Sequence, residues 1–148
     1  MKQFERWGLA LLIGGMVMEH VMGLVGYIAF VMSIVLSIFY FALGPFYFNG
    51  IALRDIFRKS AYAHTSFLRF IGAFWAGSTL GTLVVSALFS LLNYTGGREL
   101  FLIGALSGLV ILIVSLIRYR KAKDPFYRGI VIRLTLFMVL NMAMLLIG

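Results

Sequence analysis

The chain has no cysteine, and only 12% of its 148 residues are charged. The lack of cysteine excludes disulfide bridges, thiolate metal ligands, a cysteine nucleophile and a lipid-modified cysteine. A soluble domain is roughly one quarter charged, whereas 62% of this chain is hydrophobic. A small domain in water keeps much of its surface exposed, so it cannot hide that many apolar residues. The composition therefore predicts an integral membrane protein.

Acidic residues and catalytic motifs are scarce as well. The five carboxylates are scattered along the chain rather than paired, at Glu5, Glu19, Asp55, Glu99 and Asp124. The sequence contains no glycine-rich phosphate loop, no Gly-x-Ser-x-Gly elbow and no His-Glu-x-x-His pair. His20 and His64 have no companion at the spacing of metal ligands. We therefore expect no metal site, no cofactor and no enzymatic activity.

Long apolar runs make up most of the chain. A helix needs roughly 20 apolar residues to cross about 30 Å of hydrocarbon, and stretches of that kind cover residues 4–22, 24–43, 67–91, 100–117 and 129–147. They predict an all-α single-domain bundle of about five transmembrane helices. Two helical hairpins, 4–48 and 67–119, form a weak internal repeat and precede a C-terminal helix, 126–148. Gly44-Pro45 is predicted to end the second helix, and Asp124-Pro125 to separate the last two.

The last segment leaves two interpretations open, because Arg133 lies within its first turns. Either Arg133 extends its guanidinium to the headgroups and the helix crosses the membrane, or the segment lies in the interface. The C-terminus faces away from the cytoplasm in the first case and stays in the cytoplasm in the second.

Basic residues are distributed asymmetrically. If all five segments cross, 12 of the 13 basic residues, all but Arg98, fall on the side of the N-terminus. Cytoplasmic loops are enriched in lysine and arginine, so we expect a cytoplasmic N-terminus and a location in the bacterial inner membrane. Basic residues confined to short connections indicate membrane lipids as partners, including anionic headgroups, and not nucleic acid. The predicted headgroup contacts are Arg54, Arg58, Lys59, Arg118, Arg120, Lys121 and Lys123.

The longest connection, residues 49–66, contains apolar residues that alternate with arginine and lysine. This pattern is compatible with a short helix on the cytoplasmic leaflet. A solvated loop is an equally good interpretation.

Small residues recur every four positions on three predicted helices. At that spacing they share one helix face, where two backbones can approach closely. Packing within the bundle is the favoured interpretation, and an interface with a second copy or a partner subunit is the alternative. The residues are Ala29, Ser33 and Ser37, then Ala73, Gly77 and Gly81, then Gly104 and Gly108.

Glu19 and His20 form the candidate ion or proton site. Trp7 to Met18 supplies only 12 uncharged residues, roughly 18 Å of helix, so the pair could lie inside the bilayer, where an ionisable group is usually functional. A hydrated turn, in which Glu19 caps the helix or pairs with Arg98, is the favoured interpretation. Two further polar residues, Arg133 and Asn141, are eight positions apart near one helix face and are expected to bond across the bundle.

The first hairpin resembles the two-helix membrane subunit of the gliding-motility and type IX secretion motor. That family has a His-Trp-Pro-Gly turn, of which His20-Val21-Met22-Gly23 keeps the histidine and the glycine. The chain is also similar to small multi-span membrane proteins of the same bacterial group, which have His-x-x-Gly turns and a basic linker like residues 49–60. The motor subunit's lysine and glutamate fall at Val17 and near Val35, so the resemblance does not carry motor function to this chain.

The sequence thus favours a non-enzymatic membrane protein that is a structural or accessory subunit of a membrane assembly. The alternative is a component of proton or ion translocation that uses Glu19 and His20.

Overall fold

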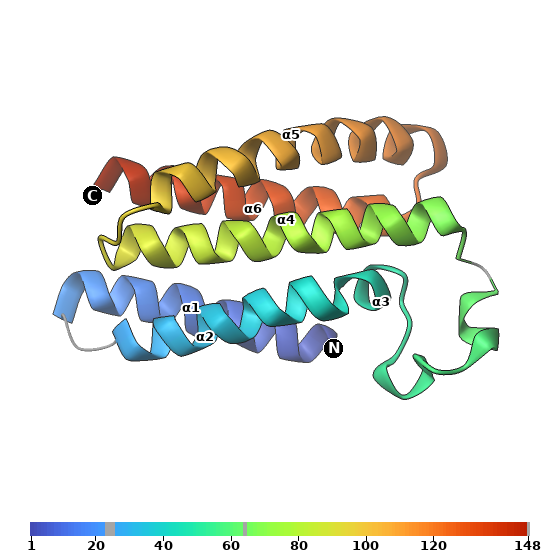
Figure 1. The fold of residues 1–148 in the computed structure, drawn as a ribbon, viewed down its shortest axis with the longest axis horizontal. Helices are drawn as coiled ribbons and strands as arrows, with labels where there is room; N and C mark the ends of the chain where they lie inside the picture. The colour runs from blue at the N-terminus through green and yellow to red at the C-terminus, as the bar shows by residue number, and fades with distance from the viewer. Residues whose placement is uncertain (23–25, 64, 148) are drawn as a thin grey trace.

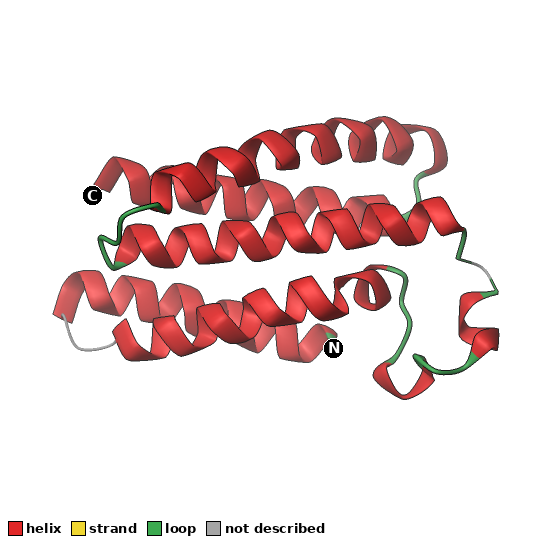
Figure 2. Cartoon of the chain, in the orientation of Figure 1, coloured by secondary structure: helices red, strands yellow, loops and turns green. Residues whose placement is uncertain are grey.

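The computed structural model describes residues 1–22, 26–63 and 65–147, and the side chains of residues 16, 18–22, 26–28, 145 and 147 lie outside that description. A π-helical turn, η1 (Phe39–Leu43), joins α2 (Gly26–Ile38) to the short α3 (Gly44–Phe48). All regular structure within the described residues is helical (Figure 2), which confirms the predicted all-α bundle. The α-helices are α1 (Lys2–Met22), α2 (Gly26–Ile38), α3 (Gly44–Phe48), α4 (Phe67–Leu91), α5 (Gly97–Ala122) and α6 (Pro125–Ile147).

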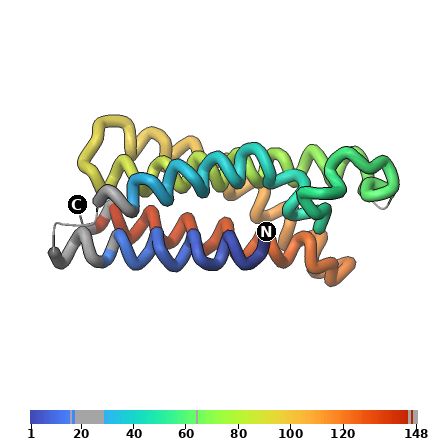
Figure 3. The backbone as a smooth tube through the Cα atoms, turned by 90° about the horizontal axis from the view of Figure 1, so that it is seen from below, coloured from blue at the N-terminus to red at the C-terminus, as the bar shows by residue number. Residues whose placement is uncertain are grey.

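The long helices lie alongside one another and alternate in direction, so the two termini lie toward opposite ends of the bundle (Figure 1). Helix α4 is central and packs against α2, α3, α5 and α6, whereas α1 packs mainly against α2. A view turned by 90° shows α1 and α6 on the same side of the bundle (Figure 3). The bundle is therefore built around α4, and α1 is its most peripheral long helix.

Four helical stretches in the described part of the chain are long and apolar enough to cross a membrane, and they are Ala29–Phe48, Phe67–Leu91, Gly97–Ala122 and Pro125–Met144. The last stretch is the one whose crossing the sequence left open. At 1.5 Å per residue, its 20 residues extend over about 30 Å, the thickness of the hydrocarbon layer. Length and composition thus favour the interpretation in which this segment crosses.

The prediction that Gly44-Pro45 ends the second helix is wrong. The chain stays helical through η1 and α3, with Pro45 in the first turn of α3. Inside a regular α-helix the proline ring collides with the carbonyl one turn earlier and cannot donate a hydrogen bond. The wider π-helical turn before Pro45 moves the proline ring away from that carbonyl group. The helical segment that begins with α2 therefore extends to Phe48.

The two basic connections differ in length, because 18 residues separate α3 from α4 and only two separate α5 from α6. Residues 49–66 contain two single turns of 3-10 helix, η2 (Leu53–Asp55) and η3 (Lys59–Tyr62), instead of one interfacial helix. The predicted break at Asp124-Pro125 is confirmed, because α5 ends at Ala122 and α6 begins at Pro125. Lys123 adopts a left-handed conformation between them, with φ +50°.

Helix α4 crosses η1 and α3 at close range. A Cβ atom on Gly77 would overlap the Tyr40 carbonyl oxygen, and a Cβ atom on Gly44 would stand 2.9 Å from the Gly77 Cα. One turn away, the Ser37 hydroxyl donates to the Gly81 carbonyl oxygen at 3.3 Å. We call this crossing of Ser37, Tyr40, Gly44, Gly77 and Gly81 the glycine seam. Only residues without bulky side chains permit so close an approach.

The other predicted small residues also lie between helices. Ala29 and Ser33 on α2 and Ala73 on α4 are completely buried. A Cβ atom on Gly104 of α5 would approach the Leu83 side chain of α4 to 2.8 Å, whereas one on Gly108 would make ordinary contacts. The structure therefore places these faces inside the bundle rather than on its outer surface.

Candidate functional site

A buried charge cluster lies between α1 and α6. Each Glu5 carboxylate oxygen accepts one hydrogen bond from a tyrosine hydroxyl and one from the Arg133 guanidinium. Tyr40 donates to Oε1 at 2.6 Å and Tyr47 to Oε2, while Arg133 donates to Oε1 through Nε and to Oε2 through Nη2, the latter at 2.6 Å. Glu5 is only 2% exposed. We call Glu5, Tyr40, Tyr47 and Arg133 the Glu5 cluster.

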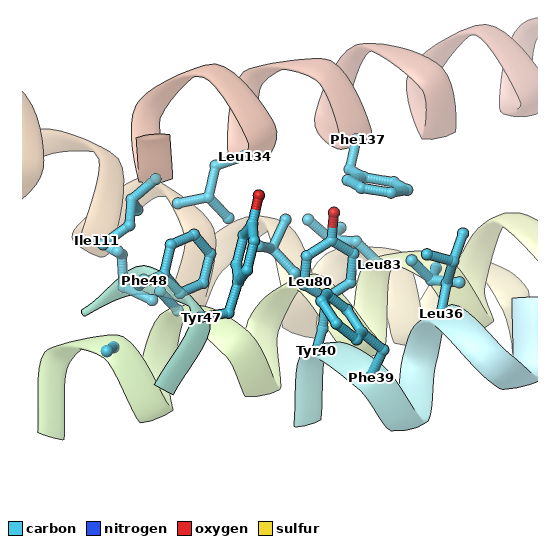
Figure 4. Close-up of a cluster of buried hydrophobic side chains, with 14 of the residues drawn as sticks. Leu36, Phe39, Tyr40, Tyr47, Phe48, Leu80, Leu83, Ile111, Leu134 and Phe137 are labelled. Carbon is cyan, nitrogen blue, oxygen red and sulfur yellow. The ribbon is translucent and has the colours of Figure 1, made fainter. Parts of the chain in front are cut away.

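Four elements position this cluster. Glu5 lies in the first turn of α1 and Arg133 in the third turn of α6. Tyr40 in η1 and Tyr47 in α3 are seven residues apart, which is about two helical turns, and their hydroxyls point in the same direction (Figure 4). The remaining Arg133 nitrogen, Nη1, donates to the Gly129 carbonyl oxygen at 3.0 Å, so the guanidinium is held from both sides.

The arrangement is a bidentate arginine–carboxylate pair to which two tyrosine hydroxyls also donate hydrogen bonds. Such pairs are strong and geometrically specific, and a carboxylate in an apolar bundle needs a partner to remain charged. Because every Glu5 oxygen is engaged by two donors, the cluster is a neutral, closed unit. Its chemistry is suited to joining helices.

A second charge cluster lies at the same end of the bundle. Arg69 in the first turn of α4 contacts Asp124 at 2.7 Å and donates through Nε to Asn49 Oδ1 at 3.0 Å. Its guanidinium stacks over the Phe126 ring, 4.3 Å from the centroid, and Asp124 accepts from the Phe126 backbone N–H at 2.8 Å. We call Arg69, Asn49, Asp124 and Phe126 the Arg69 cluster. It ties the start of α4 to the start of α6 and the end of α3.

A pocket of about 510 Å³ separates the two clusters. Helices α1, α3, α4 and α6 all contribute to its wall, including both arginines, Arg69 and Arg133, and the carboxylate of Asp124. Three more cationic residues line it, namely Lys2, Arg6 and Arg128. We call this cavity the basic pocket.

The side chains of the predicted ion or proton site lie outside the part of the chain that the structure describes. The backbone of Glu19 and His20 belongs to α1, but their side chains are not among those that the structure describes. Whether the pair lies in the bilayer or in a hydrated turn stays a prediction.

Arg133 and Asn141 form hydrogen bonds with other residues and not with each other. Arg133 turns toward Glu5 instead of extending away from the bundle to the headgroups. Asn141 is fully buried, and its Nδ2 donates to the Leu83 carbonyl oxygen of α4 at 3.0 Å and to the Phe137 carbonyl oxygen at 2.8 Å. Each residue therefore bridges α6 to a different helix.

The predicted headgroup residues are all exposed. They lie on the two basic connections and the end of α5, and they are Arg54, Arg58, Lys59, Arg118, Arg120, Lys121 and Lys123. None of the seven lines the basic pocket, whose walls are described above. Sequence reasoning missed Glu5, Tyr40 and Tyr47, although an acidic residue one turn inside an apolar helix is a usable signal.

No protein-family model, curated protein or solved structure that was compared with this chain matches it. The resemblance of the first hairpin to the motor subunit therefore stays a prediction.

Proposed function

We propose that the protein is a non-enzymatic integral protein of the bacterial inner membrane that serves as a structural or accessory subunit of a membrane assembly. The observation that carries this proposal is the closed Glu5 cluster. Its buried carboxylate accepts hydrogen bonds from two hydroxyls and a guanidinium of other elements. These hydrogen bonds hold the helices together.

Other buried polar groups support the same proposal, because they too join elements of the bundle. Asn141 of α6 donates to α4, and the Ser86 hydroxyl of α4 donates to the Gly97 carbonyl oxygen of α5 at 2.9 Å. Thr79 of α4 and Ser107 of α5 bond at 2.8 Å. A carrier of ions needs polar groups that exchange partners during the cycle, whereas a scaffold needs groups that keep them.

The proposed orientation places the N-terminus in the cytoplasm. The alternating helices bring the N-terminus, the connection 49–66 and the turn between α5 and α6 to one end, and the turn between α4 and α5 to the other (Figure 1). Twelve of the 13 basic residues thus belong to one end. Reporter fusions after Ser60 and Lys121 should be cytoplasmic, and a fusion after Asn93 should be external. The reverse pattern would overturn the orientation.

Gentle detergent extraction tests the accessory role. In-cell crosslinking followed by purification should recover the chain together with one particular membrane protein, the same in every preparation and at a fixed stoichiometry. An isolated chain that drives proton uptake into liposomes would instead support translocation. Glu19→Gln separates the two: a translocator loses proton-dependent uptake, while a subunit keeps its partner and its stability.

A further inference from the structure

The basic pocket is lined by more positive side chains than the carboxylates paired with them can neutralise. Five cationic side chains and one carboxylate line it. Arg133 is paired with Glu5, and Arg69 with Asp124. The ion pairs found among the described residues do not include the other three, Lys2, Arg6 and Arg128. After pairing, the pocket keeps three positive charges around one cavity.

The three remaining cations come from two helices. Lys2 and Arg6 are one turn apart on α1, and Arg128 lies in the first turn of α6. The two helices lie on the same side of the bundle (Figure 3) and are joined by the Glu5–Arg133 pair. The Glu5 cluster therefore sets the spacing of the cations across the pocket, because like charges on two separate helices would otherwise move apart.

The size and chemistry of the cavity fit a phosphate group. Arginine presents a planar fork of donors that matches phosphate oxygens, and lysine adds a compact charge. A volume of about 510 Å³ is that of a small-molecule site, larger than a bare ion requires. The wall also contains apolar groups, Phe48, Pro125 and Ile132, which suit the glycerol and the first acyl carbons of a lipid.

The position of the pocket indicates the source of that phosphate. Its lining residues lie at the starts of α1, α4 and α6 and at the end of α3. Figure 1 shows these starts at the end of the bundle where the two basic connections lie. In a bilayer such an end of apolar helices is at the level of the headgroups. Basic pockets between transmembrane helices commonly bind anionic lipid headgroups. We propose that the basic pocket binds the phosphate of an anionic phospholipid, held by Lys2, Arg6 and Arg128. This site is independent of the accessory role.

The test uses the full chain purified in a neutral detergent, with lipid binding followed by native mass spectrometry. Phosphatidylglycerol and phosphatidylcholine are titrated separately, and inorganic phosphate is added as a competitor. We compare the wild type with Arg6→Gln/Arg128→Gln and with the matched control Arg120→Gln/Lys121→Gln. Both double variants remove two exposed positive charges, but only the first removes them from the pocket.

The wild type should prefer phosphatidylglycerol to phosphatidylcholine. Since one basic side chain contributes about a fivefold gain in affinity for an anionic membrane surface, the pocket variant should bind phosphatidylglycerol roughly 25-fold more weakly. The control removes two predicted headgroup contacts that lie outside the pocket. Because a neutral detergent presents no anionic surface to them, the control should weaken phosphatidylglycerol binding far less than the pocket variant does. Circular dichroism of the pocket variant should be unchanged, because Arg6 and Arg128 lie outside the two clusters.

Two results would overturn the proposal. An equal loss in the control variant would show a diffuse attraction to the whole basic end. Inorganic phosphate that displaces the lipid at equal concentration would assign the pocket to a free anion instead of a headgroup.

Discussion

Two contacts join the helices of this protein by opposite means. In the glycine seam, α4 meets η1 and α3 through bare backbone, with Gly77 against Tyr40 and Gly44. In the Glu5 cluster, α1 meets α6 through long charged and aromatic side chains. The glycine seam has no room for a methyl group on Gly77. In the Glu5 cluster the two helices are joined by their side chains.

The difference follows from where each helix lies. The central α4 packs against α2, η1, α3, α5 and α6, so close packing gains dispersion contacts on several sides at once. Helix α1 packs mainly on α2. A paired carboxylate and guanidinium join α1 to α6, and the cost of separating them in an apolar environment is high.

The largest effect is expected from breaking the Glu5 cluster on one side. Arg133→Met leaves Glu5 buried without its cation, which should destabilise the bundle by about 3–5 kcal/mol. Glu5→Leu combined with Arg133→Met removes both charges and should restore most of that loss. Unfolding in micelles with increasing dodecyl sulfate measures both variants. A double variant as unstable as the single one would contradict the assignment of the effect to an unpaired charge.

The glycine seam should respond to a single methyl group. Gly77→Ala forces α4 away from η1, and overpacking of this kind costs about 1–3 kcal/mol. Gly72→Ala on the same helix is the matched control, since a Cβ atom there meets nothing within 4 Å and alanine favours the helix. The same unfolding assay should show a loss for position 77 and none for position 72. Equal behaviour of the two would remove the seam as a special contact.

The sequence predicted the seam far better than the cluster. Small residues at four-residue spacing, such as Ala73, Gly77 and Gly81, mark a packing face by geometry within one helix. Pairing Glu5 with Arg133 requires knowledge of which helices are neighbours, across a separation of 128 residues. The π turn has no comparable local signature, so the approach of Tyr40 and Tyr47 to Glu5 could not be predicted.

The basic residues at the cluster end of the bundle also differ in how well the sequence predicts their arrangement. The basic loops predict positive charge on one side of the membrane, and they contain exposed residues such as Arg58 and Lys121. The cations that share a cavity, Arg6 and Arg128, come from different helices. Their proximity depends on the bundle, which no local pattern specifies.

Asn141 offers an intermediate case, a polar contact inside the packed region. Its Nδ2 bonds to α4, but its Oδ1 has no partner among the described atoms. Asn141→Leu loses one hydrogen bond between helices and relieves one unpaired acceptor. Since such bonds in membranes average about 0.6 kcal/mol, we expect a loss of that size or less. A loss as large as that of Arg133→Met would mean that polar contacts rank by burial, not by charge.

The smallest effect is expected where a charge pair is exposed. Arg58 contacts Asp55 at 3.2 Å, but its side chain is 71% exposed, so water screens the pair and the side chain loses entropy in forming it. Arg58→Gln should change stability by no more than about 0.5 kcal/mol, which is about a tenth to a sixth of the roughly 3–5 kcal/mol expected for Arg133→Met. Both substitutions remove one arginine from one carboxylate, so the same assay compares burial directly. A similar loss at both positions would show that net charge at the basic end, and not the closed Glu5 cluster, stabilises the bundle.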